Sequence, residues 1–140
     1  MKKSVYSLLF VCFAVLSFKS QNKIDASFLF HTWKLAKLDR LTYIYKSQKT
    51  FDQKWGGIRF KKNGTIVSLN AEPACATAII ERIEADKLKL YRHRGFWQMD
   101  SDTTIIITNP KFPAINGKFI VSKLPDNSLV LKRFIKIAEK

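Results

Sequence analysis

Residues 58–69 read Ile-Arg-Phe-Lys-Lys-Asn-Gly-Thr-Ile-Val-Ser-Leu, two β-prone segments joined through Asn63-Gly64. An Asn-Gly pair in this position is the strongest short-range signal for a β-hairpin, because both residues accept the positive φ angles of a tight turn. The stretch therefore predicts two antiparallel strands, at 58–60 and 65–69. Gly56-Gly57, just before it, separates the hairpin from the preceding chain.

The chain after this hairpin continues as strands and turns. Within 88–99, alternation places Tyr91, His93, Gly95, Trp97 and Met99 on one face and Arg92, Arg94, Phe96 and Gln98 on the other. This predicts one long strand with a bulge near Gly95. A turn at 100–102 leads to a β-prone strand at 103–108, and strands at 117–124 and 128–135 form a last hairpin.

The chain before the hairpin gives weaker signals. Asp25 or Ser27 is expected to cap a short helical turn that leads into a strand at 33–38. Residues 41–55 carry scattered aromatic side chains, and their pattern is compatible with either a helix or an ordered flap. The pattern of residues 76–85 is compatible with either a helix or a strand. Short strands separated by turns predict an all-β fold, either an antiparallel barrel or a sandwich.

The first 20 residues predict an export signal. Lys2 and Lys3 precede 15 uncharged residues, 4–18, which form the short apolar segment of a signal peptide. A membrane-spanning helix needs about 20 apolar residues, so we expect cleavage and no transmembrane span after processing. Cys12 lacks the small preceding residue of a lipoprotein signal. The expected product is one domain, residues 21–140, that is periplasmic or secreted.

The composition is basic, with 25 Lys and Arg against 11 Asp and Glu and a formal net charge of +14. Such a surface attracts polyanions. The lysines are dispersed and the chain carries an export signal, so we expect weak contact with anionic lipid or another polyanion and no specific nucleic-acid partner. Cys75 is the single cysteine beyond the signal segment, which favours a buried thiol over an intermolecular disulfide.

The sequence does not predict an enzyme. Its histidines, His31 and His93, lie beside no recognisable nucleophile motif. Together with Cys75 they do not have the spacing of a metal site, and Arg92 and Arg94 on either side of His93 would repel a cation. We expect no metal and no cofactor.

Several segments together resemble the small bacterial lipocalin-like domains. They are His31-Thr32-Trp33-Lys34-Leu35, the hairpin at 60–65, Gly95-Phe96-Trp97 before 100–105, and the segments 118–121 and 129–133. The resemblance covers most of residues 28–135, with His31 where the family has the glycine of its Gly-x-Trp motif. It implies an up-and-down β-barrel, a lipocalin-like cup with a cavity for a small ligand. It also implies that Trp33 pairs with Arg133 at the closed end, which would make Arg133→Ala more destabilising than Lys132→Ala.

A barrel would turn one face of each strand inward. The candidate ligand-binding residues are then Ile58, Phe60, Tyr91, His93, Trp97 and Met99, with Arg92 and Arg94 as a basic rim for an anionic end. The same side chains can instead fill the core of an eight-stranded barrel. We expect an exported barrel that binds a small apolar or amphipathic molecule. The alternative is a non-catalytic structural or interaction module of the cell envelope that binds a partner protein or an anionic surface.

Overall fold

A computed structural model describes residues 23–52, 54–71, 81–82, 84–86 and 88–136. The expected signal segment, Cys75 and most of residues 76–85 lie outside these ranges, and the expectations for them stay predictions. Within the described ranges, none of the helices has the length and hydropathy needed to cross a bilayer.

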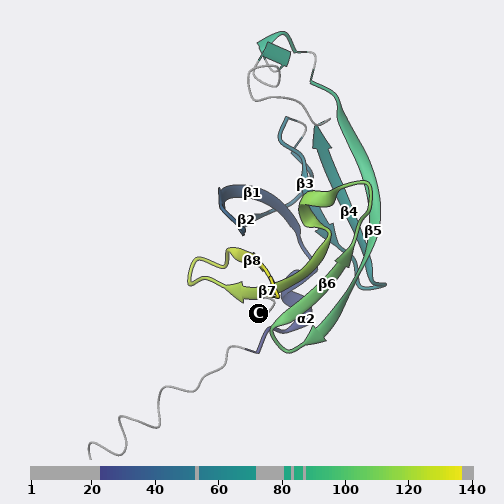
Figure 1. Ribbon diagram of the computed structural model, residues 1–140. Helices are drawn as coiled ribbons and strands as arrows, with labels where there is room; N and C mark the ends of the chain where they lie inside the picture. The colour runs from purple at the N-terminus through teal and green to yellow at the C-terminus, as the bar shows by residue number, and fades with distance from the viewer. Residues whose placement is uncertain (1–22, 53, 72–80, 83, 87, 137–140) are drawn as a thin grey trace, which may run out of the picture.

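The described chain is almost entirely β-structure (Figure 1). Its elements are helix α2 (Ala26–Leu29), strands β1 (Thr32–Asp39), β2 (Thr42–Gln48), β3 (Gly57–Phe60), β4 (Thr65–Ala71), β5 (Leu90–Ser101) and β6 (Thr104–Thr108), the 3-10 turn η1 (Pro113–Ile115), and strands β7 (Gly117–Lys123) and β8 (Leu129–Arg133). The hairpin predicted from Asn63-Gly64 is confirmed, and Gly64 has a φ of +76°.

The eight strands close into a barrel in the order β1-β2-β8-β7-β6-β5-β4-β3, and every neighbouring pair is antiparallel. This confirms the predicted antiparallel barrel. Strands β3 to β8 follow one another as a meander. The β1–β2 hairpin departs from that order, because β2 pairs with β8 and β1 pairs with β3. The connection at 49–56 must therefore pass β1 to reach β3.

Strand β2 lies within residues 41–55, for which the sequence did not decide between a helix and an ordered flap. It pairs with β1 along Thr32–Asp39 and with β8 through Tyr45 opposite Leu129. The signal for it was the alternation of Tyr43 and Tyr45, which both turn toward the core. The predicted bulge at Gly95 was wrong, since the ladder is regular there and its irregularity lies between Met99 and Ser101.

Helix α2 closes one end of the barrel, at the bottom of Figure 1. The Asp25 side chain accepts a hydrogen bond from Ser27 N, which confirms the predicted cap. Leu29 is fully buried, and its carbonyl accepts from Trp33 Nε1 at 3.0 Å. The Phe28 ring meets the Trp33 ring edge-on with centroids 5.2 Å apart. These contacts make the closed end a packed hydrophobic base.

Two glycines let the 49–56 connection enter the barrel wall. A Cβ on Gly56, whose φ is +66°, would lie 1.8 Å from the Leu69 carbonyl oxygen. A Cβ on Gly57, whose φ is +144°, would lie 2.3 Å from the Trp33 carbonyl oxygen. Only glycine fits between the backbones of β1 and β4 at these two positions.

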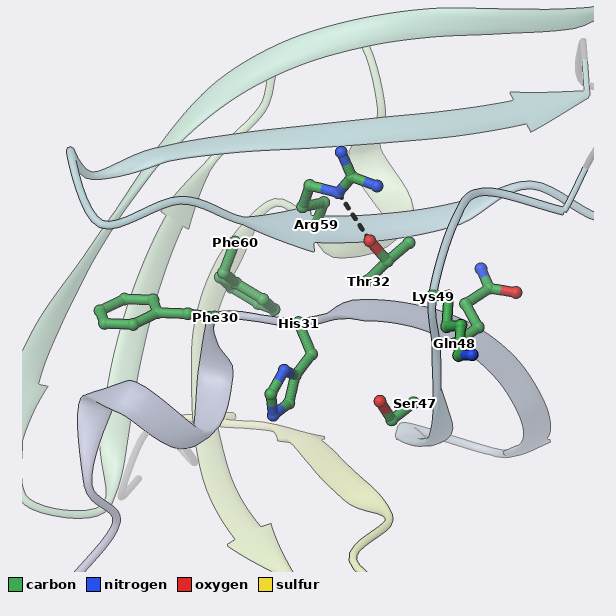
Figure 2. A pocket seen from close by; sticks show the side chains of 8 residues that line it. All are labelled: Phe30, His31, Thr32, Ser47, Gln48, Lys49, Arg59 and Phe60. Atoms are coloured by element: carbon green, nitrogen blue, oxygen red, sulfur yellow. Dashed lines mark hydrogen bonds between the residues drawn. The ribbon is translucent and has the colours of Figure 1, made fainter.

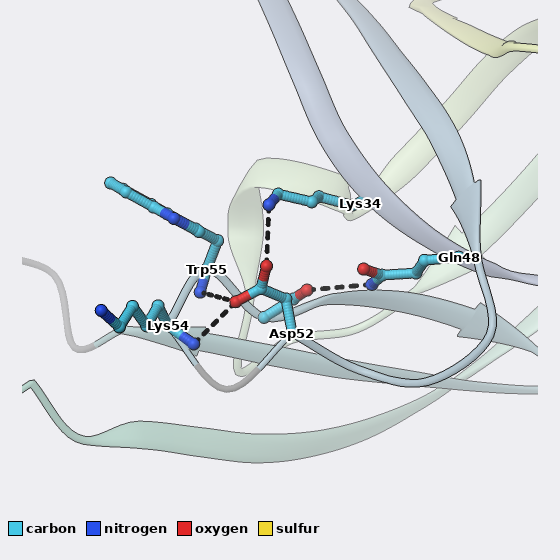
Figure 3. A network of polar contacts seen from close by, with 6 residues as sticks. Lys34, Gln48, Asp52, Lys54 and Trp55 are labelled. Atoms are coloured by element: carbon cyan, nitrogen blue, oxygen red, sulfur yellow. Dashed lines mark hydrogen bonds and ion pairs between the residues drawn. The ribbon is translucent and has the colours of Figure 1, made fainter.

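The carboxylate of Asp52 organises this connection (Figure 3). It accepts hydrogen bonds from Lys34 Nζ at 2.7 Å, from Lys54 N at 2.7 Å and from Trp55 N at 2.9 Å. The hydrogen bond from Lys34, followed by those from the two backbone amides, lowers the pKa of Asp52 from 3.8 to about 2. The ion pair with Lys34 ties the connection to β1.

Asp52→Asn is expected to lower the melting temperature at neutral pH. A carboxyl whose folded pKa is depressed contributes stability above its ordinary pKa of 3.8, and that stability is lost as the pH falls toward about 2. The difference in melting temperature between wild type and variant should therefore shrink through this window. Asp39→Asn, at an exposed aspartate of β1, is the matched control and should change little. A difference that does not vary with pH would contradict this role for Asp52.

The predicted contact between Arg133 and Trp33 is wrong. Strand β8 is antiparallel to β2, which is antiparallel to β1, so β1 and β8 run in the same direction. Trp33, near the start of β1, therefore lies at the closed end, whereas Arg133, the last residue of β8, lies at the opposite end. The Arg133 guanidinium lies 4.9 Å from the centroid of Phe119. It donates to the carbonyl oxygens of Pro113, Ala114 and Asn116, which fastens η1 to the barrel.

Candidate functional site

The predicted ligand-binding residues differ in how deeply the barrel buries them. Ile58, Phe60 and Trp97 are at most 8% exposed and belong to the core. The Phe60 and Trp97 rings meet edge-on at 5.3 Å, and Trp97 Nε1 donates to the Lys61 carbonyl oxygen at 3.0 Å. Met99 is half-buried against the same cluster. These four side chains fill the lower part of the barrel.

The other predicted residues lie farther from α2. Tyr91 is 43% exposed and His93 is half-buried, on the same face of β5 as Trp97. Arg92 and Arg94 are exposed on the outer face of β5 and do not border its inward face. The Arg92 guanidinium lies 5.8 Å from the centroid of Phe51. The alternation on β5 was thus predicted correctly. The predicted residues nevertheless lie at different depths: Trp97 and Met99 pack with the core, whereas Tyr91 is exposed.

Strand register defines successive rows of inward side chains. One row consists of Trp33, Ile58, Ser68 and His93, which are paired across β1, β3, β4 and β5. In the next row away from α2, Leu35 on β1 and the pair Asn70 and Tyr91 on β4 and β5 occupy corresponding positions. Strand β3 begins at Gly57 and therefore contributes no side chain to this row.

The inward apolar side chains of this second row, and Leu38 farther along β1, are exposed. Leu35 is 43% exposed although its cross-strand partner Tyr45 is 3% exposed and in the core. Leu38 is 54% exposed. Its cross-strand partner Tyr43 packs against the core. We use the name upper inner face for these residues, for Tyr91, and for the neighbouring inward side chains of β4 and β5. Its members are Leu35, Leu38, Tyr43, Asn70, Tyr91 and His93. The sequence analysis identified Tyr91 and His93 alone among them.

Buried polar groups mark the lower boundary of the upper inner face. Asn109 and Ser68 are both fully buried, and Asn109 Nδ2 donates to Ser68 Oγ at 3.3 Å. Asn109 can lie there because Gly95 has no side chain, and a Cβ on Gly95 would lie 2.9 Å from the Cβ of Asn109. Within the described part of the chain, Asn109 Oδ1 and Asn70 Nδ2 are buried without a hydrogen-bond partner. Buried polar atoms ordinarily have one, so this boundary has spare hydrogen-bonding capacity.

The hydroxyl of Tyr45 adds a further polar group to the barrel interior. Burial, and to a smaller extent the neighbouring Tyr43, raises the pKa of Tyr45 above its ordinary value.

A separate cleft of about 590 Å³ lies at the closed end, where β1 begins and β2 and β3 end (Figure 2). Its lining residues are Phe30, His31, Thr32, Ser47, Gln48, Lys49, Arg59 and Phe60. Figure 2 shows the two phenylalanines on one side and Ser47, Gln48 and Lys49 on the other, with Arg59 hydrogen-bonded to Thr32 between them. The sequence analysis named Phe60 alone among these residues as a site residue.

The described ranges contain no cluster of three or more His, Cys, Asp or Glu side chains positioned to hold a metal ion. Comparisons of the chain with protein-family models, with curated proteins and with solved structures give no match.

Proposed function

We propose that this protein is an exported, lipocalin-like barrel that binds a small amphipathic molecule at its upper inner face. The observation that carries the proposal is the exposure of inward-facing apolar side chains: Leu35, Leu38 and Tyr91 are 43%, 54% and 43% exposed. Side chains on the inward face of a barrel strand are normally buried. The export part of the proposal rests on Lys2, Lys3 and the uncharged segment 4–18.

The packed base limits the size of the ligand. Trp33 and Phe60 fill the barrel next to α2 with at most 2% exposure. A ligand can therefore occupy the upper part alone, which favours a short amphiphile over a long acyl chain. Its apolar part would cover Leu35, Leu38 and Tyr91, and burial of these side chains would supply the binding free energy.

Polar groups at the boundary would orient this ligand. Asn70 Nδ2 is a donor without a partner among the described residues, and Asn109 Oδ1 is an acceptor in the same condition. An unsatisfied buried amide costs about 1–3 kcal/mol. A hydroxyl or carboxyl oxygen on the ligand would accept a hydrogen bond from Asn70 Nδ2 and remove this cost. His93, half-buried opposite Ser68 in the row next to Asn70, is a second polar neighbour.

The test is a calorimetric titration of the protein with a panel of short-chain and medium-chain fatty acids and alcohols, which measures the affinity for each. Leu38→Ser is expected to weaken binding roughly tenfold because it removes one exposed apolar contact surface. The matched control is Leu124→Ser, which changes a partly exposed leucine in the β7–β8 turn at the closed end. It should leave the affinity unchanged.

Two outcomes would count against the proposal. One is that no member of the panel binds to the wild-type protein. The other is that Leu38→Ser and Leu124→Ser weaken binding equally, which would indicate nonspecific association with exposed apolar side chains.

A further inference from the structure

The closed-end cleft is built mainly from cationic and hydrogen-bonding side chains. His31, Lys49 and Arg59 line it, and none of the described residues that line it is acidic. His31 and Lys49 are exposed, whereas Arg59 is half-buried. The residues come from three places in the sequence that the barrel brings together: the α2–β1 junction, the end of β2 and the end of β3. Closure of the barrel therefore concentrates positive charge here.

Arg59 is the central group of the cleft. Its Nε donates to Thr32 Oγ1 at 2.6 Å, and its guanidinium lies 4.9 Å from the centroid of the Phe51 ring. Among the described residues, no carboxylate lies within ion-pair distance of Arg59, whereas Lys34 nearby is paired with Asp52. These contacts fix the orientation of the guanidinium, and no described residue acts as its counter-ion.

Neutral donors accompany this cation. The Thr32 hydroxyl accepts from Arg59, so its own proton is free to donate to another group. Ser47 and Gln48 add a hydroxyl and an amide on the opposite side, as Figure 2 shows. A tetrahedral oxyanion has several acceptor oxygens that point in different directions, and it matches donors converging from different strands better than a planar carboxylate does.

We propose that the closed-end cleft binds a phosphate group, either as the free ion or as the terminal group of a larger molecule whose apolar part lies against the half-buried Phe30. The phosphate oxygens accept from the Nη atoms of Arg59 and from Thr32, with Lys49 and His31 contributing at the exposed edge. This site is distinct from the upper inner face, which lies toward the other end of the barrel.

The experiment titrates the full chain with inorganic phosphate and, in a second arm, with phenyl phosphate, at fixed ionic strength. Arg59→Gln is expected to weaken phosphate binding roughly tenfold or more, because it removes a charge-assisted interaction. The matched control is Arg94→Gln, which makes the same charge change at an exposed arginine on the outer face of β5. It should leave the affinity unchanged. Tighter binding of phenyl phosphate would assign the site to a terminal phosphate, and equal binding would assign it to the free ion.

Lys49→Gln provides a second variant if Arg59→Gln does not fold, because Lys49 is exposed. It should weaken phosphate binding while leaving the melting temperature of the unliganded protein unchanged. Equal losses in Lys49→Gln and Arg94→Gln, or no binding of either probe by the wild type, would overturn the proposal. Leu38→Ser should leave phosphate binding intact, so failure of the amphiphile proposal and failure of this one are distinguishable.

Discussion

Replacing Trp33 by alanine is expected to lower the free energy of unfolding by about 3–5 kcal/mol. The Trp33 side chain is fully buried, its indole donates to the Leu29 carbonyl and its ring packs edge-on against Phe28. The substitution leaves a cavity at the point where α2 meets the first strand. It also removes one of the two hydrogen bonds that the buried Leu29 carbonyl accepts, and the bond from His31 N remains. Urea denaturation followed by circular dichroism measures the loss.

Trp55 supplies the matched control for that experiment. It is 58% exposed on the 49–56 connection, so Trp55→Ala should change the free energy of unfolding by less than about 0.5 kcal/mol. Similar losses for the two tryptophans would contradict the placement of Trp33 in the packed base.

Gly56→Ala is the second substitution with a large expected effect, a loss of about 3 kcal/mol or more. The new Cβ would lie 1.8 Å from the Leu69 carbonyl oxygen, and the φ of +66° disfavours any side chain. Because the clash is with backbone, relief requires β4 and the 49–56 connection to separate.

Gly64→Ala separates the two causes. Gly64 has a φ of +76°, but its nearest contact for a new Cβ is 3.3 Å, to the Trp97 carbonyl oxygen. Its loss should be about 1–2 kcal/mol, the cost of the left-handed backbone alone. Equal losses at Gly56 and Gly64, measured by the same denaturation, would show that the 49–56 connection is not wedged between the strands.

Most of the strands could be predicted because their signals are local. Asn63-Gly64 specifies a tight turn, and the alternation from Tyr91 to Met99 specifies which side chains share a face. The position of the β1–β2 hairpin could not be predicted in this way. Pairing of Tyr45 with Leu129 joins residues far apart in the chain, and nothing in the local pattern of either strand selects that partner.

The candidate site was harder to predict than the strands because alternation gives the face of a side chain but not its height in the barrel. Tyr91 and Trp97 share one face of β5, yet the first is 43% exposed and the second 8% exposed. Arg133 was assigned to the correct face and the wrong end, since the end depends on the direction of β8 relative to β1. Asn109 was missed because its buried position depends on the absence of a side chain at Gly95 in the neighbouring strand.

The proposal that the upper inner face binds an amphiphile is tested most directly by nuclear magnetic resonance with a spin-labelled short-chain fatty acid. The label broadens amide signals close to the bound molecule. We expect broadening at Leu35, Leu38 and Tyr91, with the signals of Phe96 and Trp55 unchanged, although these aromatic residues are 70% and 58% exposed. Broadening confined to Phe96 and Trp55, or absent from Leu35, Leu38 and Tyr91 at saturating ligand, would contradict the proposal.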